Sequence, residues 1–156
     1  MTLRPITKRK LKVLVVDDSK VITDRLRGLL TGLDCVHNVW HVENYDDTMV
    51  FIEAQNPDVI LLDIQLQGKG GIDVLTYIKR NSLPGTVIMF TNNSDDYYRN
   101  ICSKLGADYF LDKSNDFEKI PQLLENMGNR RLFPQGICNC LIVTVGSFVD
   151  LLFQSN

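Results

Sequence analysis

The sequence predicts an α/β domain with a doubly wound, five-stranded parallel sheet and helices on both faces, and three observations predict it. Apolar, strand-like runs alternate with segments whose apolar residues recur at three- and four-residue spacing, which is typical of repeated strand-helix units. The runs 13–16, 59–62 and 87–90 are apolar at every position, so those strands need cover on both faces. The 156 residues are enough for one well-packed domain and too few for two comfortable ones.

The strands are expected, in chain order, at residues 12–17, 36–43, 58–63, 86–91 and 108–112. The first, third and fourth contain the fully apolar runs and should be central, whereas the second has mixed polarity and suits an edge. A helix is expected after each strand. Short polar side chains that can accept hydrogen bonds from free N–H groups mark four helix starts, at Ser19, Asn44, Ser94 and Asn115. Glycines mark three helix ends, at Gly32, Gly106 and Gly128.

Five strand-helix repeats fill residues 11–128, which we interpret as one domain with an N-terminal extension, 1–10, and a C-terminal tail, 129–156, of uncertain structure. The tail contains an apolar run, 137–153, that is shorter than a usual membrane span and is interrupted by Asn139, Gly146 and Asp150. No membrane span is favoured. A strand or helix packed on the domain or a partner, a non-native extension and the remnant of an output domain all stay open for this run.

Composition argues against several classes of function. The net charge of −2 and the isoelectric point near 5.6 lack the basic excess typical of nucleic-acid binding, so none is predicted for this chain by itself. The four cysteines have neither the spacing of a zinc site nor the density of a disulfide framework. The N-terminus lacks the apolar core of a signal peptide. These features favour a reducing, cytoplasmic setting.

Candidate functional residues stand at the carboxyl ends of the predicted strands. Their order along the chain is Asp17 and Asp18 after the first strand, Asp63 after the third, Thr91 at the end of the fourth and Lys113 after the fifth. In an open parallel sheet these ends share one edge, where ligands bind at the point of reversal of the strand order. Three carboxylates so placed repel one another unless a cation neutralises them. Oxygen ligands in an open pocket predict a hard divalent ion, Mg²⁺ before Ca²⁺.

The same edge offers what a phosphoryl group needs. The ammonium of Lys113 can neutralise one phosphoryl oxygen, and the hydroxyl of Thr91 can donate to another. A carboxylate can then act as nucleophile and form an aspartyl phosphate. Asp63 is the best candidate, because it ends the most central and most apolar strand. His37 and His41, on the mixed second strand, are expected to lie away from this edge as packed or solvated side chains.

Five stretches match a known family in order, spacing and identity, at residues 13–19, 57–64, 71–75, 87–92 and 106–113. Over residues 10–128 the chain resembles the receiver domains of two-component response regulators, the CheY-like superfamily, in their single-domain form. The resemblance implies a flavodoxin-like fold with strand order 2-1-3-4-5. It also implies a phosphorylation-dependent signalling switch of a phosphorelay.

The resemblance implies a role for each acidic residue. Asp63 would accept a phosphoryl group from a sensor histidine kinase or a phosphotransfer protein. Asp18 would be the principal acidic ligand of Mg²⁺, and Asp17 would bind the ion directly or through water. The backbone carbonyl of Gln65 would complete the protein's ligands together with Asp63. Such a protein promotes its own phosphorylation and slow dephosphorylation but is not a turnover enzyme.

The resemblance further implies a conformational switch. Thr91 and Lys113 would contact the phosphoryl oxygens, and Phe110 occupies the family's switch-aromatic position. Phosphorylation would draw Thr91 inward and let Phe110 swing into the vacated space. A protein partner would read this change on the fourth helix, fifth strand and fifth helix, residues 94–127, and a homodimer stays open. Phe110 lacks the hydroxyl of the commoner Tyr, so packing alone must discriminate its buried and exposed states.

Two other functions stay open. The chain could be a receiver-fold interaction module that phosphorylation does not control, or the truncated receiver of a DNA-binding response regulator. A hydrolytic phosphatase of the aspartyl-phosphate type is disfavoured, because it normally needs a second Asp two residues after the nucleophile, where this chain has Gln65. Asn92 stands where the family usually has Gly or Ala, which predicts altered phosphorylation kinetics without loss of function.

Overall fold

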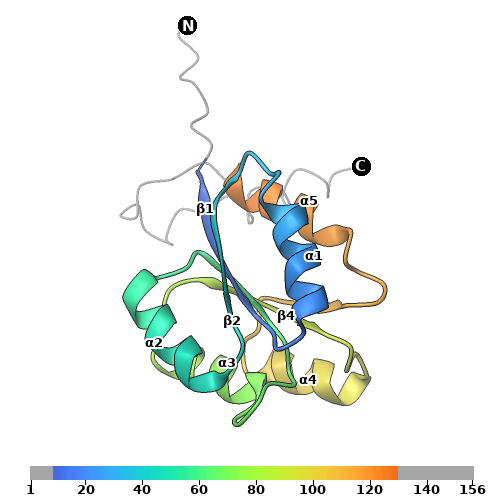
Figure 1. Ribbon diagram of the computed structural model, residues 1–156. Helices are drawn as coiled ribbons and strands as arrows, with labels where there is room; N and C mark the ends of the chain where they lie inside the picture. Colours follow the sequence, from blue (N-terminus) through green and yellow to red (C-terminus); the bar gives the residue numbers. More distant parts are fainter. Residues whose placement is uncertain (1–8, 130–156) are drawn as a thin grey trace, which may run out of the picture. The chain divides into compact units, whose positions relative to one another are not determined.

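The computed structural model describes residues 9–129, which form one sheet with surrounding helices (Figure 1). All five strands are parallel, and their order in the sheet is β2-β1-β3-β4-β5. Their bounds are β1 Leu11–Val16, β2 Val36–Val42, β3 Val59–Leu62, β4 Thr86–Thr91 and β5 Tyr109–Asp112. The predicted flavodoxin-like sheet is therefore confirmed, with the mixed strand β2 at an edge. The strand order reverses at β1 and β3, where sheets of this kind bind ligands.

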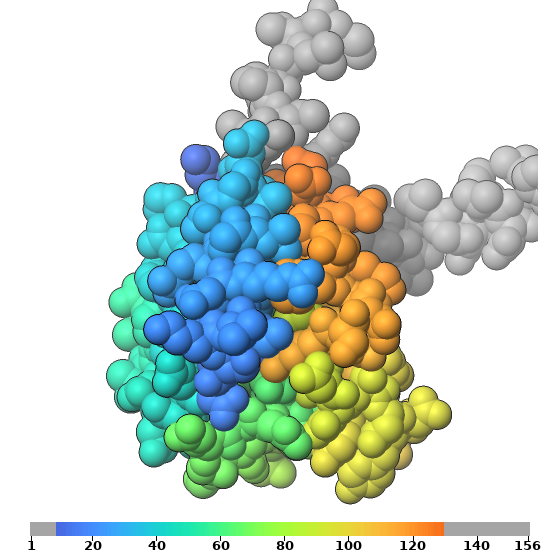
Figure 2. All heavy atoms as spheres, turned by 45° about the vertical axis from the view of Figure 1, so that its right-hand side comes forward, coloured from blue at the N-terminus to red at the C-terminus, as the bar shows by residue number. Residues whose placement is uncertain are grey.

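Helices cover both faces of the sheet and enclose two apolar cores. Their bounds are α1 Lys20–Leu30, α2 Tyr45–Gln55, α3 Gly71–Arg80, α4 Asp96–Lys104 and α5 Lys119–Gly128. One core takes buried residues from α1 and α5, and the other takes them from α2, α3 and α4. In Figure 2, α1 (blue) and α5 (orange) lie side by side. In β1, Val13 and Val15 belong to the first core and Leu14 and Val16 to the second. This division explains why the strand has no polar position there.

Several sequence-based predictions lie outside the described residues. They concern most of the extension 1–10 and the tail 129–156, including its apolar run 137–153. Within residues 9–129, no helix combines the length and apolar character that crossing a membrane requires.

Two of the four predicted helix starts are confirmed. Asn44 caps α2, and its side-chain oxygen accepts a hydrogen bond from the N–H of Asp47 at 2.9 Å. Ser19 occupies the capping position of α1, although its side chain makes no capping hydrogen bond. Its backbone N–H instead donates to the Asp17 carboxylate at 2.9 Å. The start of α1 is thereby attached to the carboxyl end of β1.

The predicted starts at Ser94 and Asn115 are wrong. α4 begins after Asp95, which caps it, and α5 begins only at Lys119. The Ser94 hydroxyl and the Asn115 amide donate instead to the Asp112 carboxylate, at 2.8 and 3.0 Å. This acceptor lies 18 residues from Ser94 and comes within reach only because β5 pairs with β4. The tertiary hydrogen bond replaces the local cap.

The three glycines predicted to end helices have different roles. Gly106 follows the end of α4 as predicted, with a φ of 91° and its N–H bonded to the carbonyl of Ser103 at 3.0 Å. Gly32 lies two residues beyond α1. Gly128 is the last residue of α5 itself, and a Cβ there would lie 2.8 Å from the Cβ of Cys35. Gly128 therefore permits close packing of α5.

The start of α3 presses against the backbone that follows β3. The N–H of Gly71 donates to the carbonyl of Ile64 at 2.8 Å. A Cβ at Gly71 would lie 1.8 Å from the carbonyl oxygen of Asp63, far inside van der Waals contact. Only glycine permits this approach, which holds the residue after β3 against the first turn of α3.

Candidate functional site

Side chains from the ends of β1, β3 and β5 meet at one buried point. The Nζ atom of Lys113 lies 2.6 Å from Oδ2 of Asp17 and 2.7 Å from Oδ2 of Asp63. The exposed fractions of these three residues are only 6%, 2% and 7%. Such burial is costly for charged groups unless they are paired, so the lysine holds together two carboxylates that would otherwise repel each other. The convergence predicted for these residues is confirmed.

The two buried carboxylates differ in their remaining oxygen. Oδ1 of Asp17 accepts the N–H of Ser19. Oδ1 of Asp63 is buried and has no hydrogen-bond partner among residues 9–129. A buried acceptor without a partner is unusual in folded proteins and favours an incoming cation or electrophile. Within the described residues, this oxygen therefore keeps its capacity to bind an incoming group.

Three carboxylates at this edge fit a divalent cation. Asp17, Asp18 and Asp63 each offer one oxygen, and these atoms all lie within 4.8 Å of one another. Asp18 is exposed while the other two are buried, so the cluster has one solvent-facing ligand. The single ammonium of Lys113 leaves the group formally negative. All-oxygen donors of this kind match the preference of Mg²⁺.

The pKa of Asp17 reflects two opposing effects. Burial raises it above the ordinary value of 3.8, while the hydrogen bonds from Lys113 and from the N–H of Ser19 lower it. Burial has the larger effect, so the net shift is upward. The negative charge of Asp17 is thus costly, and a bound cation would stabilise it.

Thr91 lies at the same edge and is connected to the lysine through the backbone. Its exposed fraction is 1%, and its carbonyl accepts the N–H of Lys113 at 3.0 Å. Its hydroxyl oxygen accepts the N–H of Asn93 at 3.2 Å. The predicted neighbourhood of Thr91 and Lys113 is therefore present, with the Thr91 side chain attached to the loop between β4 and α4.

Two predicted residues lie outside this cluster. Gln65 is in the loop after β3 with an exposed side chain, and the metal-binding role of its carbonyl stays a prediction. Phe110, on β5, is partly buried against the core beneath α4. Its ring faces the guanidinium of Arg99, whose Cζ atom is 4.6 Å from the ring centre. The switch role of Phe110 also stays a prediction.

The placement expected for His41 is wrong. Its Nε2 atom lies 2.8 Å from the carbonyl oxygen of Asp17, so a proton on this nitrogen is donated to the backbone of a site residue. The strand register, in which Val15 of β1 pairs with His41 of β2, brings His41 close to the backbone of Asp17. The predicted strand order 2-1-3-4-5 already placed β2 beside β1. The shared end of these two strands was the signal that could have revealed the contact.

A second polar cluster, which the sequence reading missed, surrounds Asp112 next to the site lysine. The N–H of Ser114 donates to its carboxylate at 2.7 Å, in addition to the side chains of Ser94 and Asn115. The backbone N–H of Asp112 donates to the carboxylate of Asp116 at 2.9 Å. These bonds join the loop before α4 to the loop that carries the lysine.

Neutralising Asp112 is expected to alter the acid sensitivity of the fold. The hydrogen bond from the N–H of Ser114, followed by that from the Ser94 hydroxyl, holds the pKa of Asp112 below its ordinary value of 3.8. A carboxylate with a lowered folded-state pKa adds stability above its unfolded pKa, and this stability is lost as the pH falls through the folded value. Asp112→Asn should therefore reduce the loss of stability below about pH 4. Urea titrations at pH 7 and pH 3 measure the free energy of unfolding of the unmodified protein and of the variant at each pH.

Asp24→Asn provides the control for that experiment. Asp24 is an exposed carboxylate on α1, remote in sequence from the Asp112 cluster. If Asp24→Asn and Asp112→Asn change the pH dependence equally, the hydrogen-bonded cluster does not explain it.

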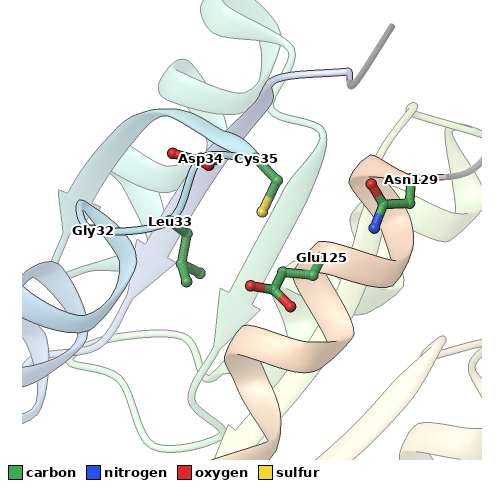
Figure 3. A pocket seen from close by; sticks show the side chains of 6 residues that line it. All are labelled: Gly32, Leu33, Asp34, Cys35, Glu125 and Asn129. Carbon is green, nitrogen blue, oxygen red and sulfur yellow. The ribbon is translucent and has the colours of Figure 1, made fainter. Parts of the chain in front are cut away.

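A hollow of about 300 Å³ lies at the other end of the sheet (Figure 3). It is lined by the loop that leads into β2 and the end of α5, through Gly32, Leu33, Asp34, Cys35, Glu125 and Asn129. Its lining side chains do not form a group suited to a metal ion: among the described residues, that arrangement occurs at Asp17, Asp18 and Asp63. The candidate site is therefore the acidic edge and not this hollow.

Comparison with known proteins agrees with the geometry. The family model described as the response regulator receiver domain matches residues 13–125. Sensory transduction protein LytT of Bacillus cereus is 31% identical over 115 residues, which cover 74% of this chain and 46% of LytT. DNA-binding transcriptional activator EvgA of Escherichia coli K12 is 23% identical over 119 residues, covering 76% of this chain and 58% of EvgA.

A solved structure agrees on the fold. The beryllofluoride-activated N-terminal receiver domain of RstA from Klebsiella pneumoniae superposes with a TM-score of 0.68 at 23% identity, covering 76% of this chain and 98% of that one. This chain spans about half the length of the curated relatives it matches. The similarity therefore concerns one part of those proteins.

Proposed function

The chain belongs to the response regulator receiver domain family, and we propose on that basis that it is a phosphorylation-dependent signalling switch. It accepts a phosphoryl group on Asp63 from a sensor histidine kinase or a phosphotransfer protein and signals through a protein partner. Members of this family are signalling modules and not, in general, turnover enzymes. We propose the same for this chain, acting in the cytoplasm.

One observation carries the proposal most directly. Asp63 has one oxygen bound to Lys113, and its other oxygen, Oδ1, is buried without a partner among residues 9–129. The ammonium fixes the orientation of the carboxylate, so that the free oxygen keeps one direction. A fixed, poorly solvated carboxylate oxygen is what a nucleophilic displacement at phosphorus needs.

The transfer is a displacement at phosphorus. Oδ1 of Asp63 forms a bond to the phosphorus of a phosphohistidine, and the bond from phosphorus to the imidazole nitrogen breaks, with its electron pair remaining on the nitrogen. Lys113 neutralises charge on one phosphoryl oxygen, and the Thr91 hydroxyl donates to another once it turns from the loop.

A divalent ion would be held by Asp17, Asp18, Asp63 and the backbone carbonyl of Gln65. When bound, Mg²⁺ supplies positive charge that stabilises the charge on the phosphoryl oxygens. The three carboxylates, whose ligand oxygens lie within 4.8 Å of one another, support this assignment.

The proposed output uses Thr91 and Phe110. A phosphoryl group that attracts the Thr91 hydroxyl competes with its hydrogen bond to the N–H of Asn93. Movement of Thr91 would then allow Phe110 to turn inward and change the surface formed by α4, β5 and α5. A protein partner, or a second copy of this chain, would bind that surface.

Phosphorylation by acetyl phosphate tests the proposal. With Mg²⁺, intact-mass measurement should detect one phosphoryl adduct, located on Asp63 by peptide mapping after borohydride reduction. Removal of Mg²⁺ with EDTA should slow formation by about 100-fold or more, because the metal supplies several kcal/mol of charge stabilisation. A protein that acquires no adduct at any Mg²⁺ concentration would instead be a phosphorylation-independent interaction module.

A second candidate function is the receiver part of a longer DNA-binding regulator. The relative EvgA is a DNA-binding transcriptional activator of which the match covers 58%. The phosphorylation chemistry would then be the same, and the output would be an attached domain.

A further inference from the structure

The ring of Phe110 is in contact with a cation from the neighbouring helix. Arg99, on α4, places its guanidinium carbon 4.6 Å from the centre of the Phe110 ring, within the range of a cation–π interaction. Arg99 is exposed, and among residues 9–129 none of the salt bridges involves it. The aromatic ring is therefore the specific partner of this guanidinium.

This contact matters because Phe110 has no polar atom of its own. A tyrosine can be held in one orientation by a hydrogen bond from its hydroxyl, whereas a phenylalanine depends on what touches its faces and edge. Here the ring is partly buried against the core beneath α4 and faces Arg99 on α4 itself. The expectation that packing alone discriminates its states is therefore incomplete, since an electrostatic contact also acts on the ring.

We propose that Arg99 is a positioning residue that holds Phe110 in its resting orientation and thereby sets how much of the protein adopts the activated arrangement. The inference rests on the proposed function, in which Phe110 turns inward on activation. Turning the ring inward breaks the contact with the guanidinium. The cation–π contact with Arg99 and the phosphoryl group on Asp63 thus favour opposite orientations of the Phe110 ring. Each must therefore weaken the preference that the other imposes on the ring.

The strength of an exposed cation–π contact determines how far the loss of Arg99 shifts the orientation of the Phe110 ring. Its loss should change the equilibrium between the two ring orientations by about 2- to 5-fold. While the activated arrangement is a minor population, a ligand that selects it gains apparent affinity by the same factor. Beryllofluoride with Mg²⁺, which mimics an aspartyl phosphate, is the appropriate probe.

The test is a beryllofluoride titration at saturating Mg²⁺, followed by the amide resonances of Thr91 and Phe110. Arg99→Met keeps an unbranched side chain but removes the cation, and it should lower the apparent Kd by about 2- to 5-fold. Arg99→Lys should restore most of the original value. Lys104→Met removes the same charge from the last turn of α4 and should leave the Kd unchanged. Thermal midpoints of all variants show that the helix is intact.

A double-mutant cycle separates this role from a merely structural one. In a Phe110→Leu background there is no ring to contact, so Arg99→Met should have no further effect on the Kd. In the unmodified protein, ring-current shifts of the Arg99 side-chain protons should diminish when beryllofluoride binds. An Arg99→Met variant with the same Kd as Lys104→Met, or with a weaker Kd, overturns the inference. A wild-type protein that does not respond to beryllofluoride overturns the proposed function itself.

Discussion

Asp63→Asn is expected to remove the phosphoryl adduct completely from protein treated with acetyl phosphate and Mg²⁺. The substitution keeps the size of the side chain, and its carbonyl oxygen can still accept from Lys113, but an amide is not a competent nucleophile toward phosphorus. The fold should persist, because the exchange removes one of two buried negative charges that lie beside a single ammonium. Intact-mass spectrometry measures the adduct, and circular dichroism checks the fold.

Asp24→Asn is the matched control for this loss. It makes the same chemical change at an exposed position on α1 and should be phosphorylated like the unmodified protein. An adduct that persists in Asp63→Asn, mapped to Asp17 or Asp18, would show that the unpartnered oxygen of Asp63 is not the attacking atom.

Gly71→Ala is expected to have the largest effect on stability. The added Cβ would lie 1.8 Å from the carbonyl oxygen of Asp63. The backbone fixes the positions of both atoms, so no side-chain rotation can relieve the clash. Overpacking typically costs 1–3 kcal/mol, and a clash with backbone belongs at or above the upper end, so we expect a loss of about 3 kcal/mol in the free energy of unfolding. Urea titration measures it. Phosphorylation should also slow, because the clash displaces the backbone of Asp63.

Gly28→Ala separates this steric effect from a general effect of glycine replacement. Gly28 is exposed within α1, and a Cβ there would have nothing within 4 Å. Because alanine favours the helix, this variant should gain about 0.5–1 kcal/mol. Equal stabilities of the two variants would contradict the close approach at Gly71.

The polarity pattern predicted the strands and their central or edge positions, because burial on one or both faces determines which positions of a strand are apolar. The fully apolar runs in β1, β3 and β4 predicted their central positions, and the mixed β2 predicted its edge position. The same pattern predicted which strand ends carry Asp17, Asp63 and Lys113, and the structure brings these three side chains together. The resemblance to receiver domains added the strand order, which the pattern alone leaves open.

Predictions from local sequence, such as helix caps, were wrong where a side chain bonds to a residue distant in sequence instead of to its own helix. Ser94 and Asn115 have the side chains of helix caps, yet both bond to Asp112. The backbone contact of His41 with Asp17 and the stacking of Arg99 on Phe110 join residues 24 and 11 positions apart. None of these contacts has a periodicity that a sequence could display.

By itself, the sequence determined the layers of this protein and the set of chemical groups at one edge of its sheet. Alternation of polarity and the lengths of the segments encode which face of an element is buried. Only the tertiary structure decided which oxygen of Asp63 has no partner in the described part of the chain, which loops join around Asp112 and which cation stacks on Phe110. Those choices depend on distances of a few ångströms between segments that pack together only in the folded chain.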